Sequence, residues 1–205
     1  MLDHPNPAIQ TSSIRTVGNI LAGDNEQAER IISCGLLPHL RKLLEHPKMY
    51  IRKEVLLSIS NVAAGSLNQI QAVIDAEIFP KLFSMLSPFD KVVAVKNEIY
   101  YVCKNALQGG NDIQIQYLID QGVIQQMCGA LDVNSSVLTV LLDGIKAILS
   151  YGEQSNTLKE ITEIIEESGG VENIKAMQCH TSEDVQQKAL YLLETYWEKV
   201  SKKDV

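Results

Sequence analysis

The clearest hydrophobic pattern in the chain lies in residues 51–65. Ile51, Val55, Ile59 and Val62 recur at helical spacing, so they would form one apolar face of a helix. Pro47 stands just ahead of this stretch and suits the first turn of a helix. The glycine at position 65 suits its C-cap. The pattern therefore predicts a long amphipathic helix that ends near residue 64.

A polar residue recurs on a second face of such helices. Leu57 and Asn61 are four residues apart and share that face. Asn19 and Asn105 stand in similar stretches on either side of Asn61, and each asparagine is followed four residues later by glycine. A fourth copy carries Ala147 at the asparagine position, at the same spacing after Asn105. The resulting period of about 42 residues in a helical chain is typical of armadillo or HEAT arrays.

Each repeat reads as a short helix, a turn at glycine or alanine, a second helix, a polar turn and a long third helix. The predicted breaks between first and second helices fall at Gly35, Ala76, Gly122 and Gly170. We expect an all-α, right-handed superhelical solenoid of armadillo repeats over residues 1–200 and a frayed tail at 201–205. Its parts would be a lone third helix from a truncated repeat, then four repeats, at 6–23, 24–65, 66–110, 111–152 and 153–200. The lone helix suggests a fragment of a longer array, and the irregular last repeat suggests a cap.

Composition narrows the classes of partner. The net charge is -7 and the pI about 5.1, which argues against nucleic acid and is compatible with a basic peptide. No apolar run approaches the roughly 18 residues of a membrane span, and the start resembles no signal peptide. The 4 cysteines form no C-x-x-C pair, which favours reduced thiols in a cytosolic or nuclear protein.

Catalytic chemistry is not indicated. The sequence contains no phosphate-binding loop, dinucleotide fingerprint, zinc-protease motif or nucleophile elbow. Its histidines are scattered, and Cys179-His180 is a lone neighbouring pair that we interpret as structural. We therefore predict a binding protein with no catalytic residue, metal or cofactor, and we interpret the acidic cluster at 160–167 as a solvated helix face.

The asparagine row is the candidate binding feature. In such solenoids the third helices stack side by side and line a concave groove, so Asn19, Asn61 and Asn105 would form a row. A primary amide both donates and accepts hydrogen bonds, so each could hold the N–H and C=O of an extended peptide. The alternative is a row of amides that only connects neighbouring helices.

The runs V-G-N-I-L-A-G-D, I-S-N-V-A-A-G and Q-Y-L-I-D-Q-G-V-I-Q closely resemble the C-terminal armadillo repeats of importin-α, and the resemblance extends from Asn6 to about Trp197. It implies the end of the sixth repeat through the tenth, within a nuclear import adaptor. Members of this family bind basic nuclear localisation signals through W-x-x-x-N motifs on third helices. The tryptophans form slots for lysine stems, the asparagines clamp the peptide backbone, and nearby acids meet the ammonium groups.

This resemblance implies a peptide-binding set, the minor site of the family. Leu57 and Tyr101 stand where the family has tryptophan, and leucine has no π-face for a cation, which costs roughly 0.5–2 kcal/mol per slot. We therefore predict a degenerate minor site with its backbone clamps retained. Leu57 could alternatively serve only packing between helices. The complete predicted set is Arg15, Asn19, Asp24, Glu54, Leu57, Ser60, Asn61, Glu98, Tyr101 and Asn105.

The resemblance also implies partners: cargo peptides, the recycling exportin, nucleoporins, and importin-β through an N-terminal segment absent from this sequence. It implies shuttling between cytoplasm and nucleus, with no nucleic-acid or membrane partner. The alternative is an armadillo scaffold or adhesion-type module outside nuclear import. A groove lined by lysine and arginine would favour that alternative, whereas Glu54 and Glu98 favour the importin interpretation. A candidate exportin surface consists of Glu160, Glu163, Glu166 and Glu167.

Overall fold

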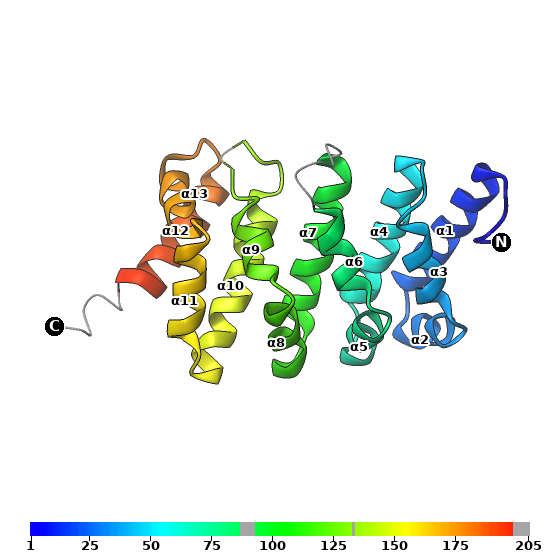
Figure 1. Cartoon of the computed structure of the whole chain (residues 1–205), viewed down its shortest axis with the longest axis horizontal. Coiled ribbons are helices and arrows are strands. Elements are labelled where there is room, and N and C mark those ends of the chain that lie inside the picture. Colours follow the sequence, from blue (N-terminus) through cyan, green and yellow to red (C-terminus); the bar gives the residue numbers. More distant parts are fainter. Residues whose placement is uncertain (87–92, 133, 199–205) are drawn as a thin grey trace. The chain divides into compact units, whose positions relative to one another are not determined.

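The computed structural model describes residues 1–86, 93–132 and 134–198. Within these ranges the chain contains helices and no strand, which confirms the predicted all-α class (Figure 1). The helices form two compact units, residues 1–114 and 115–205, which are described separately below.

Unit 1 contains a lone long helix followed by two sets of three helices. Its helices, in chain order, are α1 (Pro7–Leu21), α2 (Asn25–Ser33), α3 (Leu36–Leu43), α4 (Met49–Ala63), α5 (Leu67–Asp75), α6 (Ile78–Met85) and α7 (Val93–Gly109), and α8 (Asp112–Asp120) crosses into unit 2. Ser87-Pro88 predicts a turn that leads into a helix from Lys91, and these residues lie outside the described ones. In Figure 1 the long helices α1, α4 and α7 lie next to one another, and α4 packs against both of the others.

Local chemistry explains where these helices begin. The side chains of Asn6, Asp24 and Ser66 accept hydrogen bonds from the backbone N–H groups of the first turns of α1, α2 and α5, the N-cap role that these residue types favour. Gly35 lies between α2 and α3 with φ +80°, a left-handed conformation that glycine adopts without strain. At the equivalent break in the next repeat, the left-handed residue is Glu77, with φ +52°, and not the neighbouring Ala76.

Gly65 has a different role from the expected one. Helix α4 ends at Ala63, its C-cap is Ala64, and Gly65 does not adopt a positive φ. A Cβ atom at position 65 would lie 1.6 Å from the Oε1 atom of Gln69. A side chain at position 65 would therefore displace the amide of Gln69, which donates to the main-chain oxygen of Asn25.

The predicted apolar face of α4 forms the core of unit 1. Ile51, Val55, Ile59 and Val62 are completely buried, and so is Leu56. Because α4 packs against both α1 and α7, this face is covered from two sides. The burial of these residues confirms the apolar helix face that their spacing predicts.

Unit 2 contains the rest of the array. Its elements after α8 are α9 (Val123–Cys128), α10 (Leu138–Ser155), α11 (Leu158–Glu167), α12 (Gly170–Ala176), a 3-10 turn η1 (Met177–Cys179), α13 (Glu183–Leu193) and a π-helical segment η2 (Glu194–Glu198). The left-handed breaks are Gly122 and Gly169, the latter one residue before the predicted break. The π-helical ending departs from the regular third helix that the sequence suggested. The predicted frayed tail at 201–205 lies outside the described residues.

Candidate functional site

All but one of the predicted peptide-binding residues lie on three neighbouring helices of unit 1. Helix α1 carries Arg15 and Asn19; α4 carries Glu54, Leu57, Ser60 and Asn61; and α7 carries Glu98, Tyr101 and Asn105. The remaining residue, Asp24, caps α2. We refer to the surface formed by these residues of α1, α4 and α7 as the third-helix face.

The asparagines of α4 and α7 connect neighbouring helices. Asn61 donates from Nδ2 to the main-chain oxygen of Gly18 on α1, at 3.0 Å. Asn105 donates in the same way to the main-chain oxygen of Ser60 on α4, at 3.1 Å. Each acceptor belongs to the residue just before the asparagine of the neighbouring helix. The two amides are therefore held in the same register, one repeat apart.

The three asparagines differ in how many of their polar atoms are used. Among the described residues, the exposed side chain of Asn19 makes no hydrogen bond, and Oδ1 of Asn61 accepts none. Asn105 uses Nδ2 for two bonds, to the main-chain and hydroxyl oxygens of Ser60, and Oδ1 accepts from Lys104 Nζ at 3.1 Å. Ser60 itself is buried, so its polar atoms support the α4–α7 contact.

Charged groups on the third-helix face are paired with each other. Arg15 donates from Nε to Glu54 Oε1 at 2.7 Å, and Lys53 Nζ lies 3.6 Å from Glu98 Oε1. The hydrogen bond to Glu54, together with its negative charge, raises the pKa of Arg15. Lys53 and Lys104 were not among the residues predicted from the sequence. The available signal was the spacing between Lys53 and Glu98, which is close to one repeat.

The two positions without tryptophan expose hydrophobic surface. The exposed fraction is 45% for Leu57 and 41% for Tyr101. A leucine side chain provides an aliphatic wall, whereas a tyrosine also provides a π-face for a cation. Both side chains are therefore accessible to a ligand on the third-helix face.

A second row of amides, which the sequence analysis also missed, joins the first helices of the repeats. Gln69 and Gln114 are buried. Their Nε2 atoms donate to the main-chain oxygens of Asn25 and Leu67, at 3.4 Å and 3.0 Å. Gln114 also exchanges hydrogen bonds with Asn111 in a capping box. The N-x-x-Q spacing was the sequence signal for this structural role.

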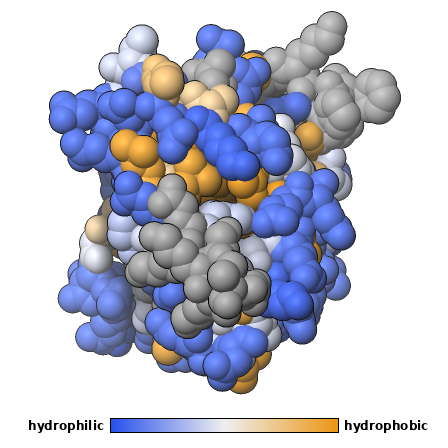
Figure 2. Space-filling view, turned by 90° about the vertical axis from the view of Figure 1, so that its left-hand side faces the viewer, coloured by the Kyte–Doolittle hydropathy of each residue, from blue (hydrophilic) through white to orange (hydrophobic). Residues whose placement is uncertain are grey.

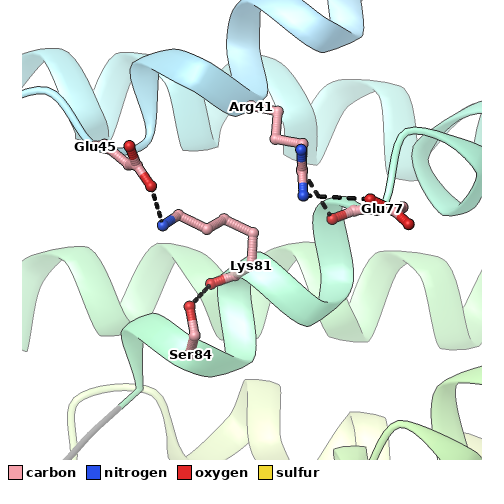
Figure 3. Close-up of polar contacts among 5 residues, drawn as sticks. All are labelled: Arg41, Glu45, Glu77, Lys81 and Ser84. Carbon is pink, nitrogen blue, oxygen red and sulfur yellow. Dashed lines mark hydrogen bonds and ion pairs between the residues drawn. The ribbon is translucent and has the colours of Figure 1, made fainter.

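The second helices α3 and α6 are joined by ion pairs on another surface (Figure 3). Arg41 Nη2 lies 3.3 Å from Glu77 Oε2, and Lys81 pairs with Glu45. A cleft of about 620 Å³ lies between these groups. The described residues that line this cleft include no asparagine or glutamine, so it is a weaker candidate for binding a peptide main chain than the third-helix face.

The acidic cluster lies on α11 in unit 2. Glu160, Glu163, Glu166 and Glu167 are all exposed, and Glu166 Oε1 accepts a hydrogen bond from Trp197 Nε1 at 2.8 Å. Figure 2 faces the end of unit 2 and shows hydrophilic side chains around a band of hydrophobic ones. The predicted role of the four glutamates in binding a transport factor stays a prediction.

Metal-ligand clusters and buried thiols were the remaining features of interest in the described residues. These residues contain no group of three or more histidine, cysteine, aspartate or glutamate side chains placed to hold a metal ion. Burial raises the pKa of Cys103 and of Cys128 to about 12, so both thiols stay protonated in the core. In this part of the chain, no helix combines the length and apolar character needed to cross a bilayer.

Two repeat families match parts of the sequence. The armadillo/beta-catenin-like repeat matches residues 24–64. The atypical armadillo repeat matches residues 159–205.

Similar proteins extend the match over the whole chain. Importin subunit alpha-8 of Arabidopsis thaliana is 33% identical over 202 residues, covering 96% of this chain and 46% of that protein. Importin subunit alpha-1b of Oryza sativa subsp. japonica is 36% identical over 203 residues, covering 96% of this chain and 38% of that protein. The chain thus spans less than half the length of these relatives.

A solved structure confirms the armadillo fold. A designed armadillo repeat protein in complex with the peptide (KR)4 superposes with a TM-score of 0.82 and 29% identity. The match covers 95% of this chain and 78% of the designed protein. A further designed armadillo repeat protein has a TM-score of 0.69 at 26% identity, over 94% of this chain and 95% of that chain.

Proposed function

Because the chain belongs to the importin-α family of armadillo-repeat proteins, we propose that its third-helix face binds extended basic peptides, as part of a nuclear import adaptor. The cargo would be nuclear localisation signals, and the protein would shuttle between cytoplasm and nucleus. The observation that carries the proposal is the side chain of Asn61, whose bond to the main-chain oxygen of Gly18 holds it in place while, among the described residues, Oδ1 and one N–H stay unused. A fixed amide with an unused donor and an unused acceptor suits the main chain of an extended peptide.

The inter-helix bonds leave Asn61 able to bind a peptide. A primary amide has two N–H donors and a carbonyl acceptor, and Asn61 uses one donor for Gly18. The other donor and Oδ1 match the C=O and N–H of one peptide unit. The bond to Gly18 then orients the side chain before a ligand arrives, which reduces the entropy lost on binding.

Side chains around the amides supply the preference for basic residues. Glu54 and Glu98 bring negative charge to the face, and Leu57 and Tyr101 offer surface to the stems of lysine and arginine. The designed protein with a similar fold was solved with the peptide (KR)4, which makes this peptide a suitable probe. Its affinity here should be modest, because Leu57 lacks a π-face.

The variant Asn61→Ala tests the backbone clamp. We expect it to weaken (KR)4 binding about tenfold, because the peptide loses one or two hydrogen bonds. The dissociation constant is measured by isothermal titration calorimetry, after melting curves confirm that the variant folds. The matched control is Asn68→Ala, an exposed asparagine on α5. Equal affinities for Asn61→Ala and the unmodified protein would contradict the proposal.

The variant Leu57→Trp tests the slot. A tryptophan here adds a π-face worth roughly 0.5–2 kcal/mol to a cation, so the affinity for (KR)4 should rise between about twofold and thirtyfold. The control is Leu67→Trp, because Leu67 is similarly exposed but lies on α5. A similar rise for both variants, or no rise at position 57, would show that this position does not contact lysine or arginine stems.

A further inference from the structure

At α7, the groups that would bind a peptide are already bonded within this chain. The carboxylate of Glu98 lies 3.6 Å from Lys53 Nζ, and Oδ1 of Asn105 accepts from Lys104 Nζ at 3.1 Å. Nδ2 of Asn105 donates twice to Ser60. The acid and the amide oxygen of α7 are therefore each occupied by a lysine, and the amide nitrogen by a serine.

The other two helices of the face differ from α7. Among the described residues, Asn19 makes no side-chain hydrogen bond, and Asn61 keeps Oδ1 and one N–H unused. Glu54 on α4 is paired with Arg15, but within the described ranges no lysine bonds to an asparagine oxygen on α1 or α4. The capacity to bind a peptide backbone therefore decreases from α1 to α7.

We propose that Lys53 and Lys104 form a latch that closes α7 to basic peptides, so that binding is confined to α1 and α4. The inference rests on the proposed function and deepens it, because it identifies the lysines that limit which part of the face a peptide reaches. The partner that fits the latched face is a short basic segment that contacts two helices.

The positive charges of Lys53 and Lys104 explain how the latch excludes basic peptides. Side-chain exposure is 36% for Lys53 and 17% for Glu98, so water screens this pair less than a fully exposed one. The bond from Lys104 to Asn105 carries a full charge on its donor, which strengthens it relative to a neutral hydrogen bond. A lysine or arginine of a ligand would have to displace one ammonium group and approach the other against like-charge repulsion.

The latch makes a prediction about peptide length. Neighbouring packed helices lie about 8–10 Å apart, so a ligand must extend roughly 16–20 Å to reach from α1 to α7. The eight residues of (KR)4 span up to about 26–29 Å when extended, whereas the four residues of (KR)2 span about 13–14 Å. In the unmodified protein, (KR)4 should therefore bind only about twice as tightly as (KR)2, because the longer peptide can occupy α1 and α4 in more than one register.

The test removes the latch while keeping the aliphatic stems, with Lys53→Met/Lys104→Met. We expect (KR)4 to bind about tenfold more tightly to this variant than to the unmodified protein, and (KR)2 to change little. The control Lys42→Met/Lys175→Met removes the same charge from exposed positions on α3 and α12. Adding Asn105→Ala to the latch variant should abolish the gain, because the freed amide would then be missing.

Each outcome decides between the two proposals. A gain in (KR)4 affinity no larger than that of the control, or one that survives Asn105→Ala, overturns the latch. The proposed function is then still tested separately by Asn61→Ala. If melting curves show that the methionine variant does not fold, Lys53→Gln/Lys104→Gln replaces it in the same titrations. If neither peptide binds the unmodified protein or a folded latch variant, the latch and the proposed function both fail.

Discussion

The variant Ile59→Ala is expected to lower the free energy of unfolding by about 2–5 kcal/mol. Ile59 is completely buried on α4, and α4 packs against both α1 and α7. The substitution removes buried methyl and methylene groups and leaves a cavity that rigid neighbouring helices fill only in part. Urea denaturation followed by circular dichroism measures the change.

Leu57→Ala is the control for this prediction. Leu57 lies two residues away on the same helix but on the exposed third-helix face, so its truncation should change the unfolding free energy by no more than about 0.5 kcal/mol. A small effect of Ile59→Ala, or an equally large effect of Leu57→Ala, would show that the packing of α4 does not dominate the stability of unit 1.

The second large effect is expected for Gln114→Ala, which should lower the unfolding free energy by about 1–3 kcal/mol. The buried Nε2 atom donates to the main-chain oxygen of Leu67 and to Gln71 Oε1, and Oε1 accepts from the backbone N–H of Asn111. Alanine would leave these groups without their partner in a site that water reaches poorly. The same denaturation experiment measures the loss.

Gln108→Ala provides the matched comparison, because Gln108 is an exposed glutamine on α7. We expect its effect to lie within about 0.5 kcal/mol of zero. If the two variants lose the same stability, the buried amide row between first helices does not contribute measurably. That result would also mean that the hydrogen bonds between Gln114 and Asn111 do not contribute measurably to stability.

The sequence predicted that the candidate residues lie on equivalent helices, but it did not predict their hydrogen bonds. The repeat period identified Asn19, Asn61 and Asn105 as equivalent, and the structure places them on neighbouring helices. The repeat period did not identify the hydrogen-bond partners of these asparagines, because the acceptors of Asn61 and Asn105 are main-chain oxygens, which every residue carries. Lys53 and Lys104 were overlooked for a related reason: a lysine on a helix gives no sign of which neighbouring group its long side chain will reach.

By itself, the sequence determined the class of the fold, the end of α4, the breaks between first and second helices to within one residue, and the buried face of α4. These features depend on local spacing and on capping residues such as Asn6 and Asp24. Only the tertiary structure decided that Gly65 faces the buried side chain of Gln69 and which atoms of each asparagine remain for a ligand. Both depend on distances between atoms that packing brings together. In a repeat protein the neighbours that decide the asparagine bonds come from the adjacent repeat, which is distant in the sequence.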